Sequence, residues 1–243
     1  MSSTTAQKLR ILHLYPRDMN IYGDNGNVLT VYRRAQWHGL TPEVITYDPG
    51  DRFPENIDII IGGGGQDSGQ DKVQTTLHRI APLLHELAEN DTPMLMICGL
   101  YQLFGRFFKT GNGEIIEGIG IFDMETHAGP ERLIGNIVTH SEQFGDLVGY
   151  ENHSGLTYLG TSLQPLATIV HGAGNNGQDP TEGARYKNVI GTYLHGSILP
   201  KNPLLADFLI ETAATKKYGE FMPNVIDDQI ARKAREVAMK RPR

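Results

Sequence analysis

The sequence predicts an α/β fold in one domain, with a mostly parallel central sheet flanked by helices and some added antiparallel strands. Strand-like and helix-like segments alternate through the first half, as in parallel sheets covered by helices. The runs at 57–61 and 94–97 are almost wholly apolar, which is typical of central strands buried on both faces. Beyond residue 110, short glycine-rich strand-like runs change this rhythm and indicate antiparallel additions to the sheet.

The length of the chain suits one domain of this kind. Its 243 residues are 39% hydrophobic, enough to bury a substantial core. We expect the single domain to fill 1–243, with a core over about 8–218 and a last helix at about 225–240. The segment MSSTTAQKLR has no signal-like apolar region, and no run approaches the roughly 18 apolar residues of a membrane span.

Charge and cysteine usage exclude several functions. The net charge of −6 and the absence of a basic-aromatic patch argue against nucleic-acid binding. The basic C-terminal stretch ARKAREVAMKRPR is typical of a helix end exposed to solvent. One cysteine excludes an internal disulfide and favours a reducing, cytoplasmic setting. Nine scattered histidines show no metal-ligand spacing, so we expect no metal site.

The first strand is expected at 9–15, and a polar loop follows it. Asn27 is placed to cap the next helix. Asp24 lies just beyond the end of the strand, where α/β sheets carry functional loops. It is equally suited to a turn in which the side chain bonds its own backbone.

A run of four glycines, at 62–65, follows the buried strand at 57–61. Glycines there allow close approach of the backbone to a ligand, and their N–H groups could bind an oxyanion. A tight turn is the alternative. The run is not a P-loop, since no Gly-Lys-Ser/Thr follows. Another strand is expected at 44–47, before the strand at 57–61, and a helix is expected at 71–90, after the glycine run.

The only cysteine, Cys98, follows the apolar run 94–97 directly. A helix-like run comes next, with Tyr101, Leu103, Phe104, Phe107 and Phe108 at helical spacings. A strand, a sharp turn at a nucleophile and then a helix form a nucleophile elbow, here with cysteine in the serine position. The helix N-terminus favours thiolate. A small buried hydrophobe closing a core strand is the alternative.

The second half contributes a second candidate for catalysis. A hairpin is expected after residue 110, then short strands at 132–138, 147–150, around 158 and at 166–170. The strand at 188–194 ends at His195. Because parallel strands end on one edge of a sheet, His195 should meet Cys98 as a thiolate–imidazole pair. A purely structural histidine is the alternative. A helix at 204–218 follows.

Seven segments, taken together, resemble class I glutamine amidotransferases of the cobyric-acid-synthase-like branch, and in particular the GatD family of glutaminase subunits from lipid II isoglutaminyl synthases. They are YGDNGN (22–27), IIIGGGGQD (59–67), ICGLYQLFG (97–105), ERLIGNIV (131–138), GYENHSGLTY (149–158), GAGNNGQDPTEG (172–183) and GTYLHGSILPKNP (191–203). They cover nearly the whole chain in order.

The resemblance implies a role for each site residue. Cys98 is the nucleophile that attacks the side-chain amide of L-glutamine, and His195 is its base. Arg132 holds the α-carboxylate of glutamine, which a guanidinium can clamp through two hydrogen bonds. The remaining substrate-binding residues are Gly64 and Gly99, through oxyanion N–H groups, and Gln102.

Two positions depart from the family pattern. Leu100 replaces the second glycine of the usual CGGYQ, which could reshape the turn or the pocket. Ser197 stands where many class I enzymes carry the triad glutamate. The in-chain candidates for the missing acid are Asp24, Glu151 and Glu182. We expect instead that an acidic residue of a partner subunit completes the site.

The resemblance also implies the biological setting. The partner would be a MurT-like subunit of the Mur ligase family, forming a heterodimer and using ATP and Mg²⁺ that this chain does not bind. Together they would amidate the D-glutamate α-carboxylate of lipid II to D-isoglutamine, in the bacterial cytoplasm at the inner face of the membrane. The alternatives are a glutaminase for another synthetase, of corrinoid type, and a non-catalytic binding module. Arg132 and the C-terminal motifs argue against a cysteine peptidase.

Overall fold

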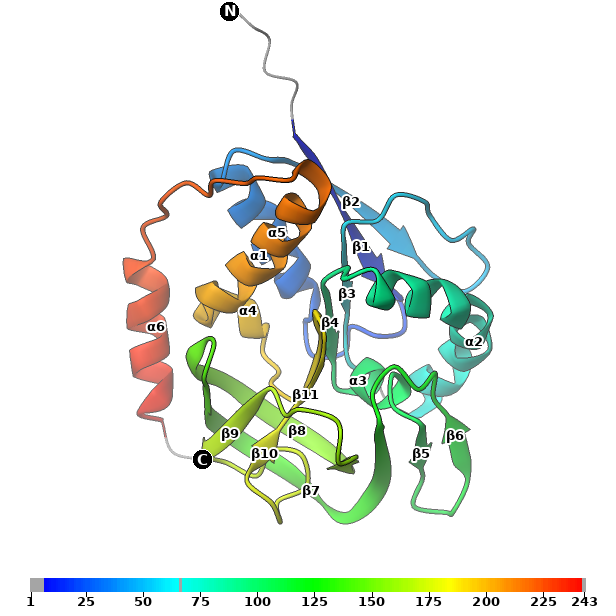
Figure 1. Ribbon diagram of the computed structural model, residues 1–243. Coiled ribbons are helices and arrows are strands. Elements are labelled where there is room, and N and C mark those ends of the chain that lie inside the picture. The colour runs from blue at the N-terminus through cyan, green and yellow to red at the C-terminus, as the bar shows by residue number, and fades with distance from the viewer. Residues whose placement is uncertain (1–6, 66, 242–243) are drawn as a thin grey trace, which may run out of the picture.

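Two β-sheets organise the computed structural model, which describes residues 7–65 and 67–241 (Figure 1). The first sheet has six strands in the order β11-β12-β4-β3-β1-β2, parallel except for β11. Its strands are β1 (Lys8–Leu14), β2 (Thr41–Tyr47), β3 (Ile59–Gly62), β4 (Met94–Ile97), β11 (Ala184–Tyr186) and β12 (Val189–Thr192). The predicted α/β class with a mostly parallel central sheet is confirmed.

Helices cover both faces of this sheet. The helices of the described residues are α1 (Asn25–Trp37), α2 (Asp67–Glu89), α3 (Gly99–Leu103), α4 (Ile198–Lys201), α5 (Pro203–Tyr218) and α6 (Gln229–Met239), of which α6 packs on α4 and on the second sheet instead. In Figure 1, α1 and α5 lie on one side of the sheet and α2 lies on the other. Strands β3 and β4 are buried at every residue between these layers, as their apolar sequences predict. None of the described helices is both long and apolar enough to cross a membrane.

The strands from β5 to β10 form a sheet of their own, antiparallel except for the parallel pair β5–β7, which corrects the expectation that they extend the central sheet. They are β5 (Phe107–Lys109), β6 (Ile115–Glu117), β7 (Met124–Ser141), β8 (Gly145–Leu159), β9 (Ala167–His171) and β10 (Thr181–Glu182). The long strands β7 and β8 pair with each other along most of their length and form a two-stranded ribbon, the β7–β8 ribbon. The short strands expected at 132–138 and 147–150 are parts of them. Only β11 adds an antiparallel strand to the central sheet.

Two local expectations were wrong. The helix after Cys98 ends at Leu103, and Phe107 and Phe108 belong to strand β5 instead. At that corner a Cβ added at Gly105 would lie 3.0 Å from the Met124 carbonyl oxygen, a tight contact. Asn27 lies inside α1 rather than capping it, and its Oδ1 accepts the Leu199 N–H at 3.0 Å.

One backbone contact joins the two sheets at the edge that carries the site. The His195 N–H donates to the Tyr150 carbonyl at 2.8 Å, and the Tyr150 N–H donates back at 3.3 Å. His195 follows β12 of the central sheet, while Tyr150 belongs to β8 of the second. This bridge fixes the residue after β12 against the long ribbon, so both sheets contribute to the same region.

Candidate active site

Cys98 lies in the sharp turn that the sequence predicts. Its φ of 49° and ψ of −102° lie outside the usual regions for an L-residue, between β4 and the first residue of α3. The turn sets the side chain at the end of β4, beside the N-terminus of a helix. That terminus stabilises negative charge on sulfur. Cys98 is nearly buried but lines a cavity of about 550 Å³.

The side chains of His195 and Cys98 both lie close to Gly64. A Cβ added at Gly64 would lie 3.0 Å from Cys98 Cβ and 3.2 Å from His195 Cε1. Any larger residue at position 64 would therefore push the two side chains aside. The ring of Tyr22 packs on the His195 ring with centroids 4.3 Å apart. The two residues that the sequence placed at neighbouring strand ends are thus brought together.

The imidazole of His195 is held neutral. It is 1% exposed, and burial lowers its pKa to about 3, with smaller contributions from His153 and Arg132. Within the described residues, neither ring nitrogen has a hydrogen-bond partner. A neutral ring can accept the thiol proton, but this environment disfavours the imidazolium that results. A carboxylate against the ring would correct that.

No carboxylate of the described chain fills that role by hydrogen bonding to the His195 ring. Glu151 is buried and accepts the N–H groups of Ala173 and Gly174 at 2.9 Å. Glu182 accepts from the Thr192 hydroxyl and the Tyr193 N–H, both at 2.8 Å, and burial raises its pKa to about 8. Both therefore support backbone segments.

Ser197 and Leu100, the two departures from the family pattern, have structural roles. The Ser197 hydroxyl donates to the Gly23 carbonyl at 2.9 Å, which ties the loop after His195 to the loop after β1. Leu100 is fully buried, and a Cβ at Gly62 would lie 2.3 Å from its Cδ1. Leu100 therefore packs behind the glycine run and is not among the residues that line the cavity.

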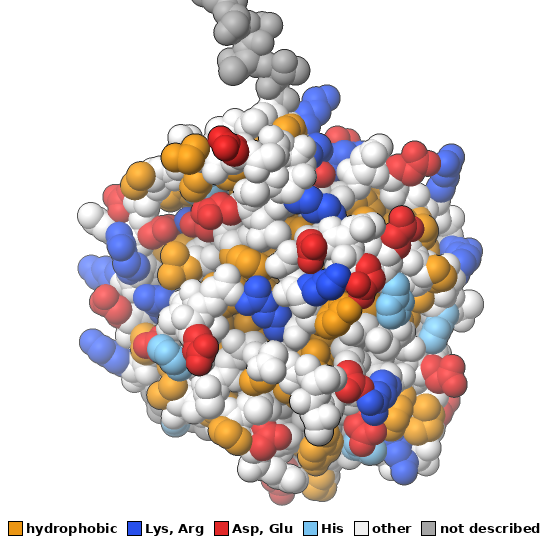
Figure 2. Space-filling view, viewed as in Figure 1, with side chains coloured by type: hydrophobic (Ala, Val, Ile, Leu, Met, Phe, Trp, Pro, Cys, Tyr) orange, Lys and Arg blue, Asp and Glu red, His pale blue; other side chains and the backbone are white. Residues whose placement is uncertain are grey.

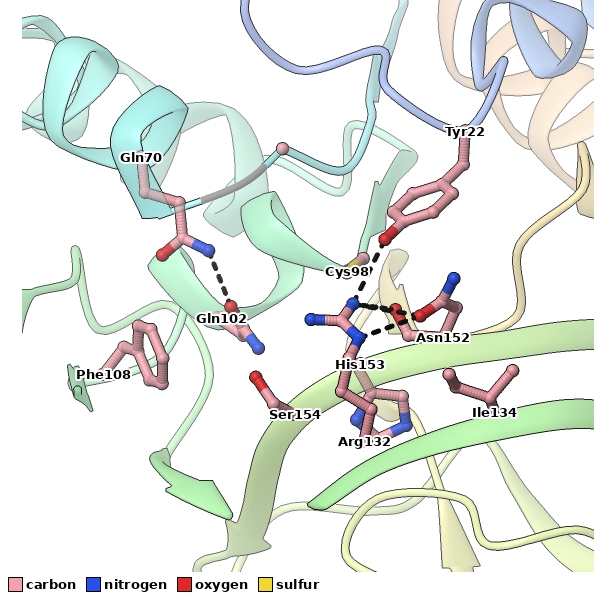
Figure 3. Close-up of a pocket in the computed structure, with 11 residues that line it drawn as sticks. Tyr22, Gln70, Cys98, Gln102, Phe108, Arg132, Ile134, Asn152, His153 and Ser154 are labelled. Atoms are coloured by element: carbon pink, nitrogen blue, oxygen red, sulfur yellow. Dashed lines mark hydrogen bonds between the residues drawn. The ribbon is translucent and has the colours of Figure 1, made fainter. Parts of the chain in front are cut away.

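Arg132 projects from β7 into the wall of the cavity (Figure 3). Its Nε and Nη2 donate to Asn152 Oδ1 at 3.1 and 3.0 Å, and Nη2 also donates to the Tyr22 hydroxyl at 3.2 Å. These contacts hold the guanidinium plane in place at an otherwise exposed position. An oriented cation there suits a substrate carboxylate.

Replacing Arg132 with alanine should raise KM for glutamine by about 10- to 100-fold, the equivalent of one charge-assisted pair of hydrogen bonds. The change in kcat should be smaller, because the contact is remote from the reacting amide and equal in ground and transition states. Arg132→Lys should restore little, since a point charge does not reproduce the fork. Steady-state glutaminase kinetics measure both. An unchanged KM with only a lower melting temperature would make Arg132 structural.

Gly64 does not supply the oxyanion donor expected of it. Its N–H donates to Asp24 Oδ2 at 2.8 Å and is therefore committed within the chain. The neighbouring Gly65 lines the cavity, and its nitrogen would lie 3.0 Å from a Cβ added at Gly99. Gly99 is the first residue of α3, where helix N–H groups lack partners in the helix. The Gly65 nitrogen and Gly99 thus lie close together, next to Cys98.

Asp24 is neither a simple turn residue nor a group in hydrogen-bond contact with His195. It is fully buried, its side chain makes no cap bond to α1, and it joins the loop after β1 to the glycine run. Burial raises its pKa to about 6, partly offset by the Gly64 N–H. Asp24 positions the backbone on which Cys98 and His195 meet.

Asp24→Asn should change how stability depends on pH. The pKa of Asp24 is raised on folding, so its contribution is favourable below about pH 4 and is lost as pH rises through about 6. The wild type should therefore lose about 2 kcal/mol relative to Asp24→Asn between pH 4 and pH 7. Urea unfolding at both pH values measures this difference. Parallel profiles for the two proteins would show that Asp24 does not titrate in this range.

Gln102 lines the cavity, and its side-chain amide also forms hydrogen bonds with two neighbouring side chains. Its Oε1 accepts from Gln70 Nε2 at 2.8 Å (Figure 3). Its Nε2 donates to the Tyr193 hydroxyl at 3.0 Å. Tyr193 continues the network to Thr157 at 2.7 Å. The orientation of the Gln102 amide is therefore set by its neighbours.

Several residues of the cavity received no role from the sequence. They are Tyr22, Gln70, Asn152, His153 and Ser154. Most lie within the segments YGDNGN and GYENHSGLTY, so the family motifs marked the region without giving functions. His153 stacks on Tyr193 with ring centroids 3.6 Å apart. Among the described residues, no group of three or more His, Cys, Asp or Glu side chains could hold a metal ion.

Comparisons with known proteins show the family of the chain. Residues 10–203 match the CobB/CobQ-like glutamine amidotransferase domain. The subunit GatD of lipid II isoglutaminyl synthase (glutamine-hydrolyzing) from Staphylococcus aureus strain N315 is 40% identical over 238 residues, 96% of each chain. Its counterpart from Streptococcus pneumoniae is 41% identical over 216 residues, 88% of this chain and 83% of that one.

A solved structure shows the same fold at low sequence identity. PurLQS from Thermotoga maritima superposes with a TM-score of 0.59 at 14% identity, covering 88% of this chain and 100% of that one. The domain match spans most of the chain, and the two bacterial relatives align along nearly all of it. The chain therefore belongs to the family of CobB/CobQ-like glutamine amidotransferases.

Proposed function

We propose that this chain is the glutamine-hydrolysing subunit of a lipid II isoglutaminyl synthase. The observation that carries the proposal is the similarity to relatives of that name along nearly the full length of both chains. The site supports the same chemistry. Cys98 lies in an elbow turn close to the buried His195, and Cys98 and Arg132 line one cavity.

Hydrolysis begins with transfer of the glutamyl group to sulfur. Arg132 holds the α-carboxylate of glutamine, which places the side-chain amide at Cys98. The thiol gives its proton to His195, and sulfur attacks the amide carbon to form a C–S bond. The resulting oxyanion accepts hydrogen bonds from the Gly65 and Gly99 N–H groups. His195 then protonates the departing nitrogen, the C–N bond breaks, and ammonia leaves a γ-glutamyl thioester.

A second half-reaction regenerates the cysteine. Water attacks the thioester carbonyl while His195 takes its proton. The C–S bond breaks, glutamate leaves, and the proton returns to sulfur. Each turnover therefore converts glutamine and water into glutamate and ammonia.

The ammonia is consumed by a partner. We assign this role to a MurT-like subunit of the Mur ligase family, which binds ATP and Mg²⁺ and activates the D-glutamate α-carboxylate of lipid II. Ammonia attack on that activated carboxylate gives D-isoglutamine in the stem peptide. The reaction takes place in the bacterial cytoplasm, where the head group of lipid II is accessible at the inner membrane face.

A glutaminase assay of this chain with the Mur-ligase-family subunit of the same organism tests the proposal. Glutamate and ammonia should appear in equal amounts. A non-catalytic binding module would release neither. Hydrolysis that rises with a corrinoid synthetase but not with the Mur-ligase-family subunit would assign the chain to that other pathway.

A further inference from the structure

A groove separates α6 from the β7–β8 ribbon, outside the catalytic cavity. Its volume is about 620 Å³, and its walls include Tyr150 from β8 together with Ile230 and Val237 from α6. These apolar side chains are unusually open: Ile230 is 87% exposed, Val237 51% and Tyr150 41%. Exposed apolar residues gathered in one hollow mark an interaction surface more often than scattered ones do.

Helix α6 is placed to present a face rather than to build the core. None of its residues is fully buried, although its sequence is strongly amphipathic. Ile230, Ala234 and Val237 are spaced by four and three residues, so they form one stripe along the helix. The helix is anchored at its start, where Asp228 pairs with the buried Arg34 at 2.6 Å. Along its length, Arg235 donates to the Asp146 carbonyl at 3.3 Å.

The groove adjoins the catalytic cavity on one face of the ribbon. Ile134 pairs with Asn152 and both line the cavity, while Asn136 pairs with Tyr150 and both line the groove. Residues two apart on a strand point to the same face and are separated by roughly 7 Å. A macromolecule in the groove would therefore border the substrate cavity. It would also border His195, whose backbone pairs with Tyr150.

The rim of the groove is positively charged, against the overall charge of −6. Lys201, Lys233 and Arg241 all line it. Lys201 donates to the carbonyl of Gly196, next to His195, at 3.1 Å. Burial lowers the pKa of Lys201, and the positive charge of Arg241 lowers it further. In Figure 2, basic and acidic side chains both lie along the left edge, over α6.

We propose that the groove between α6 and the β7–β8 ribbon is the docking surface for an acidic, apolar-anchored segment of the synthetase partner. The three basic side chains select the acidic segment, and the stripe on α6 receives its apolar side chain. Because the groove lies next to the cavity on the ribbon, a synthetase bound there would reach the edge of the cavity and His195. The ring of His195 has no hydrogen-bond partner among the described residues. The inference rests on the proposed function, because it takes the synthetase subunit as the occupant.

The test is binding of the Mur-ligase-family subunit to Val237→Asp and Lys233→Glu variants of the full chain. Since no residue of α6 is fully buried, both variants should fold with unchanged circular dichroism. We expect Kd to rise at least about 10-fold for each, because an acidic residue opposes the bound segment. The glutaminase activity of the isolated variants should equal that of the wild type.

Matched controls lie on the other side of the molecule. Leu83→Asp on α2 changes a similarly exposed apolar residue, and Arg52→Glu reverses an exposed charge. Both should bind the partner within twofold of the wild type. If the wild-type pair forms and the groove variants bind equally well, the surface is wrong while the proposed function stands. If the wild-type pair does not associate, both proposals fail.

Two other occupants would overturn the proposal. Loss of binding to phosphatidylglycerol vesicles in the groove variants, with partner binding intact, would make the surface a membrane contact. A dimer of the isolated wild-type chain in ultracentrifugation, broken by Val237→Asp with partner binding intact, would make it a contact between copies.

Discussion

Cys98→Ala should abolish glutamine hydrolysis by the subunit and by its complex, with a loss on the order of 10⁴-fold or more. Only the sulfur forms the covalent intermediate, and removal of a nucleophile typically eliminates most of the rate enhancement. Enzymatic measurement of glutamate release gives the rate. Retention of a rate near that of the wild type would exclude Cys98 as the nucleophile.

The fold of this variant should be intact, because alanine is smaller and still fits the elbow turn. Unchanged circular dichroism and partner binding would show this. A diazo-ketone analogue of glutamine should label Cys98 in the wild type, as detected by peptide mass spectrometry. His195→Ala should lower both the labelling rate and turnover, because the thiol loses its base. Labelling of a different residue would argue against the proposed site.

Binding of the partner should raise kcat/KM for glutamine by on the order of 10²- to 10⁴-fold, the range over which a positioned acid–base group contributes. In the isolated chain, burial holds the pKa of His195 at about 3. Imidazolium is therefore costly to form. An Asp or Glu of the partner reaching the ring would stabilise it and fix the tautomer.

The pH profile separates this explanation from simple tightening of the site. A carboxylate beside His195 raises its pKa, so the acid limb of kcat/KM in the complex should move toward neutral pH. In the isolated chain that limb should lie well below pH 5, since His195 stays neutral there. Alanine substitution of Asp24, Glu151 and Glu182 provides the in-chain comparison. Full activity of the isolated chain, lost in one of these variants, would place the acid within this chain.

The sequence predicts the central strands well because their signal is local. The apolar run before Cys98 matches β4 residue for residue, and the strand before His195 contains β12. Both ends are marked by abrupt changes of residue type. The convergence of Cys98 and His195 then follows from the shared direction of parallel strands, without knowledge of the rest of the fold.

Features that depend on distant pairing could not be predicted in this way. The Gly64 N–H meets a carboxylate 40 positions earlier in the chain, so its loss as an oxyanion donor appears only in the structure. The run at 107–108 fits a helix by spacing alone, but its pairing with β6 and β7 makes it a strand. The low pKa of His195 likewise arises from packing between two sheets.

Transfer of isotope from glutamine to lipid II tests the account most directly. The complex is supplied with ATP, Mg²⁺, lipid II and glutamine labelled with ¹⁵N in its side-chain amide, and the stem peptide is analysed by mass spectrometry. The account predicts ¹⁵N in the D-isoglutamine amide of the wild-type product. Cys98→Ala should give no labelled product from glutamine, yet should still form D-isoglutamine from added ammonium. Labelled product from the Cys98→Ala complex, or none from the wild type while ammonium is used, would contradict it.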